Sequence, residues 1–262
     1  MEAINDFLFT VQGPGMNFHP QYNWLVTPFF ILVVPFIYLV STISLFFFVE
    51  LNDIKIPKTT LKPFMFIYNL SQIILCSYMT WGLSEYFTWD NPFAIHKPEK
   101  ASIEWFILVH ALSKYLDWCD TLFIILNRNS HKQLSVLHIY HHMTIGSVAW
   151  NFALSQGVGG GVVAFPSNIN NVTHVLLYSH YMMTSFGFRN PLKKWLTRWQ
   201  ITQFYLCILH PITGVLLNDY RKNFAMYQIA YHCTMIYLFG WHMDWRPGFV
   251  NKYSTANKKK LS

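Results

Sequence analysis

Apolar stretches of about 20 residues, separated by short polar segments, run along most of the chain, and an α-helix of that length spans the hydrocarbon core of a bilayer. The first stretch, residues 24–49, contains no charged residue. The third and fifth stretches carry several polar residues and score weakly in hydropathy. The pattern predicts an all-α, polytopic membrane protein. Its seven transmembrane helices are expected at residues 24–49, 63–85, 105–126, 136–155, 163–187, 199–217 and 223–244.

The composition favours a membrane protein over a soluble one. Hydrophobic residues make up 53% of the 262 residues and charged residues 12%, against about 25% charged residues in soluble domains. This balance excludes a disordered chain and disfavours a soluble enzyme, because too few charges remain to cover a surface in water. Residues 1–23 have no basic start before an apolar run, so no cleavable signal peptide is expected. We expect one membrane domain over residues 1–262, with a tail at about 245–262.

Lys and Arg are distributed unevenly between the two sides of the predicted bundle. They number three, two, four and five in segments 50–62, 127–135, 188–198 and 245–262, which makes 14, against four in the segments that alternate with these. Cytoplasmic loops carry the excess of basic residues in membrane proteins. The N-terminus is therefore expected in the lumen and the C-terminus in the cytosol.

The last residues suggest a location. Lys259 and Lys260 stand at the fourth and third positions from the C-terminus, and on the cytosolic side this resembles a dilysine retrieval signal of the endoplasmic reticulum. The alternative is a solvated basic tail near anionic lipid. We favour retrieval, which predicts a multi-pass protein of the endoplasmic reticulum membrane.

Ionisable residues occur in the third predicted helix, where the membrane makes them costly. Lys114, Asp117, Asp120 and Thr121 fall within about 120° on one face of a helix that turns about 100° per residue. One interpretation is an internal salt bridge that orders the bundle. The other is that the acids orient histidines or position a substrate. Cys119 points away from this face, and we interpret all four cysteines as buried thiols rather than nucleophiles.

Three histidines open the fourth predicted helix. His138, His141 and His142 follow the spacing i, i+3 and i+4, which places them on one side of a helix. A lone histidine in an apolar setting is usually a packed core residue, but three on one face are harder to explain in that way. Imidazole binds metals, transfers protons near neutral pH and acts as a nucleophile.

Two further helices carry polar residues at helical spacing. The face of the fifth helix is predicted to hold Asn170, His174, Tyr178 and Tyr181, and the sixth helix begins with Thr197, Gln200 and Gln203. At about 1.5 Å per residue from the cytosolic ends, Asp117 and Tyr178 lie about 13 Å deep, His142 about 9 Å and Gln203 about 6 Å. We therefore expect a polar chamber that opens to the cytosol and continues as an apolar tunnel.

A metal site is an alternative role for the histidines. The H-x-x-H-H pattern also occurs in membrane di-iron enzymes, which need several such boxes to hold two irons. Among the 12 histidines there is one such box, so a di-iron site is disfavoured and a mononuclear site stays open. We assign no metal ligand and expect no cofactor.

Four motifs together resemble a known family. They are K-x-x-D-x-x-D-T (114–121), H-x-x-H-H (138–142), H-x-x-L-Y-x-H-Y (174–181) and T-x-x-Q-x-x-Q (197–203). In this order, over about residues 60–245, they resemble the very-long-chain fatty acid elongases, the 3-oxoacyl-CoA synthases of the endoplasmic reticulum. Tyr68-Asn69 also resembles a position of that family. The chain departs from the usual pattern at Asp117, Leu177 and His180, where the family has Glu, Met and Tyr.

The resemblance implies an acyltransferase that condenses a long-chain acyl-CoA with malonyl-CoA, giving 3-oxoacyl-CoA, CO2 and CoA. His141 is the expected nucleophile or base, with His174 and Asn170 stabilising the enolate or oxyanion. His138 and His142 are expected to orient partners through Asp117 and Asp120. Expected substrate-binding residues are Lys114, Thr121, Tyr178, Tyr181, Gln200 and Gln203, with Lys193, Lys194 and Arg198 as contacts for CoA phosphates.

Other interpretations remain. The three cations beside the sixth helix fit ordinary positive-inside anchoring as well as phosphate binding. A seven-helix transporter or receptor, or a metal-dependent lipid hydroxylase, would share the topology. The expected partners are acyl-CoA, malonyl-CoA, the lipid bilayer and other enzymes of the elongation cycle, and no nucleic acid is expected. Acyl length, unsaturation and oligomeric state do not follow from the sequence.

Overall fold

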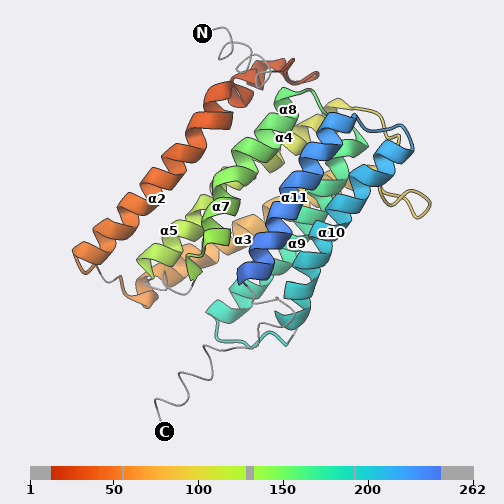
Figure 1. Ribbon diagram of the computed structural model, residues 1–262. Helices are drawn as coiled ribbons and strands as arrows, with labels where there is room; N and C mark the ends of the chain where they lie inside the picture. The colour runs from red at the N-terminus through yellow and green to blue at the C-terminus, as the bar shows by residue number, and fades with distance from the viewer. Residues whose placement is uncertain (1–12, 55, 128–132, 192, 243–262) are drawn as a thin grey trace, which may run out of the picture.

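Helices account for nearly all of the described structure. The computed structural model describes residues 13–54, 56–127, 133–191 and 193–242 (Figure 1). Within these ranges no β-strand is present, apart from one isolated bridge between Thr88 and Asn91. The elements are η1 (Pro20–Val26), η2 (Phe29–Val33), α2 (Val34–Leu51), α3 (Lys58–Leu83), η3 (Ser84–Tyr86), α4 (Ala101–Leu116), α5 (Trp118–Leu126), α7 (Val136–Thr144), η4 (Ile145–Asn151), α8 (Phe152–Ser155), α9 (Gly161–Ser185), α10 (Lys193–Leu216) and α11 (Lys222–His242).

The described elements form seven long helical rods, one for each predicted span. Three rods are composite: η1, η2 and α2 form the first, α4 with α5 the third, and α7, η4 and α8 the fourth. The fourth rod has its predicted limits, and the other six differ from theirs by a few residues at one or both ends. The all-α prediction is therefore confirmed for the described ranges.

Hydropathy by itself identifies fewer spans than the fold does. Among the described helices, the rod Pro20–Leu51 is the one that is both long and apolar enough to cross a membrane by composition. The third and fifth rods contain the polar residues noted above, and these lower their hydropathy.

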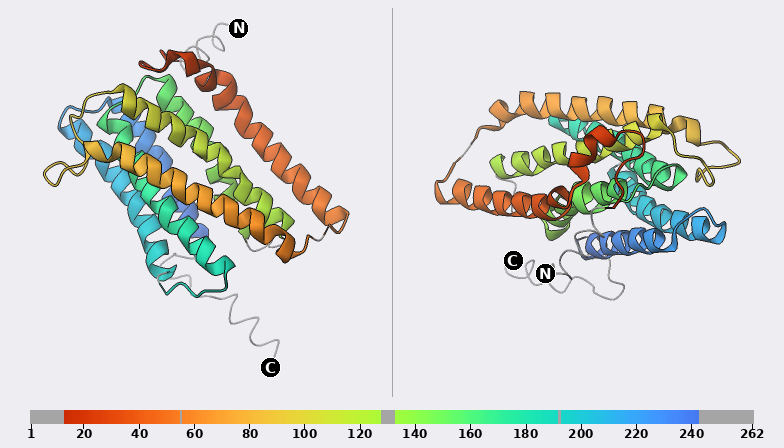
Figure 2. Two further views of the ribbon diagram at one scale, coloured as in Figure 1. Left: turned by 180° about the vertical axis from the view of Figure 1, so that it is seen from behind. Right: turned by 90° about the horizontal axis from the view of Figure 1, so that it is seen from above.

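Consecutive rods run antiparallel to one another (Figures 1 and 2). The helix α3 runs along α9, α9 also packs against α10, and α10 packs against α11. Further around the bundle, α11 contacts α7, and η4 contacts α4. The helix α2 lies at one edge, against α5 and α7. This arrangement places α7–η4–α8, α9, α10 and α11 around one shared interior space.

Two local irregularities fall in the rods that carry the candidate site. The α-helical pattern of the third rod is interrupted at Asp117, where Asp120 N–H bonds to Asp117 O over 3.1 Å, a tighter turn than an α-helix makes. In the fourth rod, η4 is a π-helix over Ile145–Asn151. A π-helical turn inserts an extra residue, and such turns often occur at functional sites. The sequence predicted both rods as continuous α-helices, and periodicity could not reveal these one-residue changes.

The connection between the fourth and fifth rods depends on glycine. Gly157 and Gly160 have φ angles of 60° and 64°, a region that residues with a Cβ atom rarely adopt. Gly160 directly precedes α9, and the turn reverses the chain within a few residues. Residues of α8 and α9 line the same interior space on either side of this turn.

Candidate active site

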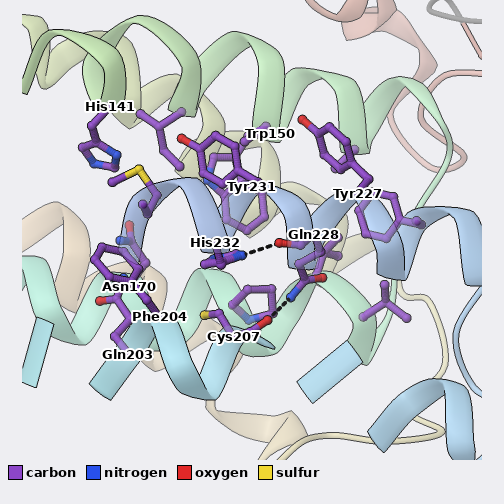
Figure 3. A pocket seen from close by; sticks show the side chains of 18 residues that line it. His141, Trp150, Asn170, Gln203, Phe204, Cys207, Tyr227, Gln228, Tyr231 and His232 are labelled. Carbon is purple, nitrogen blue, oxygen red and sulfur yellow. Dashed lines mark hydrogen bonds between the residues drawn. The ribbon is translucent and has the colours of Figure 1, made fainter. Parts of the chain in front are cut away.

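Of the three histidines of α7, one faces an internal cavity and two pack ring against ring. The side chain of Ser135 accepts a hydrogen bond from the N–H of His138 over 3.1 Å and so caps the start of the helix. The rings of His138 and His142 pack together, with centroids 4.2 Å apart. His141 instead lines an internal cavity (Figure 3). The shared face predicted from spacing is therefore divided: one histidine faces the cavity, and two pack beside it.

The cavity has a polar end formed by three side chains from three helices. His141 of α7, Asn170 of α9 and Gln203 of α10 lie together at one end (Figure 3). Nδ1 of His141, Oδ1 of Asn170 and Oε1 of Gln203 are buried and have no hydrogen-bond partner. Buried polar atoms without a partner are costly. This end is thus suited to a ligand that brings polar groups of its own.

The rest of the cavity is mostly apolar and elongated. Along α11 its wall extends from Phe224 to Met235, which corresponds to about 16 Å at 1.5 Å per residue. Gln228 and His232 also line this part, but they are engaged: Nδ1 of His232 donates to Gln228 O over 2.7 Å, and Nε2 of Gln228 donates to Cys207 O over 3.1 Å (Figure 3). A long apolar channel with one polar end fits a hydrocarbon chain that carries a polar head group.

Behind the polar end lies a buried ion pair. Nζ of Lys114 lies 3.5 Å from Oδ2 of Asp117, and both side chains are almost completely enclosed. Nδ1 of His174 lies 3.8 Å from the same carboxylate oxygen. The internal salt bridge predicted from the sequence is therefore present. His174 is turned toward this carboxylate from α9.

The second acid is held by tyrosines. The hydroxyl of Tyr178 donates to Oδ2 of Asp120 over 2.7 Å and lies 3.2 Å from Oδ1 of Asp117. Tyr68 of α3 reaches the Tyr178 hydroxyl over 3.1 Å. The contact of Tyr178 with both acids agrees with the equal depth predicted for Asp117 and Tyr178. Helices α3, α5 and α9 therefore meet in one hydrogen-bonded cluster.

His138 has a partner that the sequence analysis did not assign to it. Oγ1 of Thr121 lies 2.8 Å from Nε2 of His138 and 2.8 Å from the hydroxyl of Tyr38 on α2. The expected partners of His138 and His142 are instead Asp117 and Asp120. In the described ranges Asp120 is bonded to Tyr178 instead, because the turn at Asp117 directs Asp120 toward α9 and Thr121 toward α7.

Several predicted site residues lie at the edge of this cluster. Tyr181 packs against Tyr178, with centroids 6.0 Å apart, but its side chain is exposed. Gln200 is half-buried and does not line the cavity. The exposed cations Lys193, Lys194 and Arg198 lie in the first two turns of α10, and the guanidinium of Arg198 lies 5.2 Å from the centroid of the Trp195 ring.

Two of the four cysteines are less buried than predicted. Cys76 and Cys207 are buried as expected, whereas Cys119 is half-buried and Cys233 is exposed. None of the four is interpreted from the sequence as a nucleophile. Cys207 nevertheless lies in the cavity wall, one helical turn from Gln203 on α10 (Figure 3). Its place could not be predicted, because it depends on how α10 is rotated against α11.

Some residues that build the site were missed in the sequence. Gln72 donates through Nε2 to Oδ1 of Asp117 over 2.6 Å, and Tyr38 holds Thr121. Tyr231 and His232 line the cavity from α11. None of them falls in the polar motifs recognised in the sequence. Gln72 gave a usable signal, because an amide at membrane depth requires a partner.

The remaining predictions concern a metal site and the basic tail. Within the described ranges, no group of three or more His, Cys, Asp and Glu side chains is arranged to hold a metal ion. Lys259 and Lys260 lie outside the described residues, as do Arg128, Lys132 and the rest of the basic tail.

Comparison with known proteins places these features in a family. A family model described as ELO, the GNS1/SUR4 family, matches residues 23–261. Fatty acid elongase 5 of Leishmania major is 39% identical over 235 residues, which cover 89% of this chain and 92% of that protein. Fatty acid elongase 5 of Trypanosoma cruzi is 40% identical over 180 residues, covering 68% and 70%. Very long chain fatty acid elongase 5 of Mus musculus is 35% identical over 155 residues, covering 57% and 48%.

Proposed function

The chain belongs to the ELO family, and from this premise we propose that it is the condensing enzyme of a fatty acid elongation cycle. It joins a long-chain acyl-CoA to malonyl-CoA and gives a 3-oxoacyl-CoA, with release of CO2 and CoA. Relatives named fatty acid elongases support this assignment. The elongated apolar cavity with one polar end suits an acyl chain whose thioester lies at His141.

The unpaired ring nitrogen of His141 at the cavity's polar end is the observation that carries the proposed mechanism. An imidazole nitrogen attacks the thioester carbonyl, the C–S bond breaks, and CoA leaves with a proton. Malonyl-CoA then loses CO2, and its enolate carbon attacks the acyl-imidazole. The C–N bond breaks, the departing ring nitrogen takes up one proton from water, and the neutral ring and 3-oxoacyl-CoA result.

Negative charge on oxygen develops in both steps and needs hydrogen-bond donors in place beforehand. The amide of Asn170 lies at the polar end of the cavity and can donate to this oxygen. His174 lies on the same helix, one turn further along α9. Its Nδ1 is near Asp117, which leaves Nε2 to accept a proton from a reacting group.

The CoA part of each substrate carries phosphates. Lys193, Lys194 and Arg198 are exposed at the end of α10 that is predicted to face the cytosol. In this proposal they bind those phosphates. The positive-inside orientation of the same three residues would bring them to the side on which CoA substrates are expected.

The proposal extends to location and partners. The basic segments support a lumenal N-terminus and a cytosolic C-terminus. Lys259 and Lys260 support retrieval to the endoplasmic reticulum. Because a 3-oxoacyl-CoA must be reduced, dehydrated and reduced again to become a saturated acyl-CoA, enzymes of those reaction classes are expected partners.

The test is direct synthesis of the product. The purified protein in detergent is incubated with malonyl-CoA and a series of acyl-CoA primers, and mass spectrometry looks for 3-oxoacyl-CoA two carbons longer than the primer. A product establishes condensation, and the preferred primer defines the substrate. If a well-folded sample gives no product with any primer, the proposal fails, and metal analysis and transport assays test the hydroxylase and transporter alternatives.

A further inference from the structure

Gln72 on α3 is a fully enclosed amide at the centre of the polar cluster. Its Nε2 donates to Oδ1 of Asp117 over 2.6 Å and to the hydroxyl oxygen of Tyr68 over 3.1 Å. The first of these is the shortest side-chain contact that the structure gives Asp117. A hydrogen bond to a carboxylate is about twice as strong as one between neutral groups.

The two oxygens of Asp117 have different surroundings. Oδ1 accepts from Gln72 and lies 3.2 Å from the hydroxyl of Tyr178. Oδ2 is buried without a hydrogen bond, 3.5 Å from Nζ of Lys114 and 3.8 Å from Nδ1 of His174. Lys114 and His174 therefore compete for one oxygen, and neither is at hydrogen-bond distance.

A third group determines how the Asp117 carboxylate is oriented between Lys114 and His174. The Lys114 ammonium is buried and has no hydrogen bond, so electrostatic attraction favours closure of Asp117 onto it. An aspartate has only two side-chain torsions, and fixing one oxygen largely fixes the other. The 2.6 Å bond from Gln72 keeps the carboxylate from rotating toward Lys114.

We infer that Gln72 is a positioning residue, whose amide anchors Oδ1 of Asp117 so that Oδ2 stays between Lys114 and His174 instead of closing fully onto Lys114. With Oδ2 in this place, the proton of the neutral His174 ring stays on Nδ1. Nε2 then keeps its lone pair and faces away from the acid. Gln72 acts through two residues and touches no substrate, since it does not line the cavity.

The consequence for turnover rests on the proposed function. Replacing Gln72→Met keeps the volume and removes both donors. We expect kcat for condensation to fall on the order of ten-fold to a hundred-fold, as small misplacements of reacting groups do. KM for both substrates is expected to stay within about two-fold. The matched control is Ser71→Ala, an exposed neighbour on the same helix, for which kcat and KM are unchanged.

A rescue experiment separates positioning from packing. Asp117→Glu alone brings an extra methylene against the Gln72 amide and lowers kcat. In the Gln72→Met background the longer carboxylate reaches His174 without the amide. The double variant is therefore expected to recover kcat by about five-fold or more over Gln72→Met. If packing alone caused the loss of kcat, the effects of the two substitutions on kcat would add, and the double variant would be slower than Gln72→Met.

A second measurement does not require turnover. The variants Gln72→Met and Asp117→Asn, alone and combined, form a double-mutant cycle of thermal midpoints in detergent. Non-additive shifts support the bond, and additive shifts overturn the inference. Wild-type kcat in Gln72→Met also overturns it. If the wild-type protein makes no 3-oxoacyl-CoA, the proposed function fails, and the thermal cycle still decides the link between Gln72 and Asp117.

Discussion

The hydroxyl of Thr121 on α5 lies 2.8 Å from Nε2 of His138 on α7, and this contact fixes the first histidine of the H-x-x-H-H motif. Tyr38 on α2 completes the chain at 2.8 Å from the same hydroxyl. One arrangement satisfies all three groups: Tyr38 donates to Thr121, and Thr121 donates to His138. The outermost helix of the bundle is thereby connected to the histidines.

The first prediction concerns this chain of hydrogen bonds. Thr121→Val keeps the shape but leaves His138 Nε2 unpaired and removes one of the partners of the buried Tyr38 hydroxyl. Each unpaired group costs about 1–3 kcal/mol, so the thermal midpoint in detergent falls clearly. Thr121→Ser keeps the hydroxyl and loses one methyl group, worth about 0.8 kcal/mol. Equal midpoints for the two variants would contradict the assigned role of the hydroxyl.

The second prediction distinguishes a histidine from a cysteine nucleophile. His141 and Cys207 both line the cavity, but His141 lies at its polar end (Figure 3). His141→Ala is expected to lower kcat at least about a hundred-fold, the lower range for loss of a proton-transferring or nucleophilic group. Cys207→Ala is expected to keep condensation activity. Both variants are first compared with wild type by thermal unfolding. Full activity of a folded His141→Ala protein would contradict the proposed mechanism.

The third prediction uses the shape of the cavity. Ala153 of α8 lines its apolar part, about 18 Å along the fourth rod from His141 at 1.5 Å per residue. Ala153→Leu should shorten the space for the acyl chain, so elongation of the longest primers is lost while that of shorter primers remains. The measurement is the product distribution over a primer series. Ala101→Leu, at an exposed site, is the control. An unchanged distribution for Ala153→Leu would show that acyl chains do not occupy this part.

The fourth prediction tests the cations of α10. The triple variant Lys193→Gln, Lys194→Gln and Arg198→Gln should raise KM for malonyl-CoA with little change in kcat, because binding contacts remote from the reaction act on both states equally. The difference from wild type should shrink at high salt, since exposed charges are screened. Lys222→Gln, at the opposite end of the bundle, is the control. An unchanged malonyl-CoA dependence would leave these residues as membrane anchors.

The histidine motif illustrates the limit of sequence periodicity. The spacing of His138, His141 and His142 correctly predicted a helix with all three near one side. Only the packed structure shows His141 at the cavity and the other two ring against ring. A face of a helix covers a wide arc, and the neighbouring helices decide which part of it meets the interior.

The acids illustrate a second limit. The pairing of Lys114 with Asp117 follows from spacing within one helix, and the structure contains it. The bond from Gln72 to Asp117 joins residues 45 positions apart, and the bond from Tyr38 to Thr121 joins residues 83 apart. Spacing along the chain says nothing about such pairs, because they depend on which helices become neighbours.

The sequence by itself determined seven helices, their approximate limits and the presence of polar clusters within them. These features follow from local burial and from helical period, which each segment carries in its own residues. Tertiary structure alone decided the cavity, its polar end at His141, Asn170 and Gln203, and the partners of Asp117 and His138. Those depend on the rotation and neighbour order of helices, which are settled only when all seven pack together.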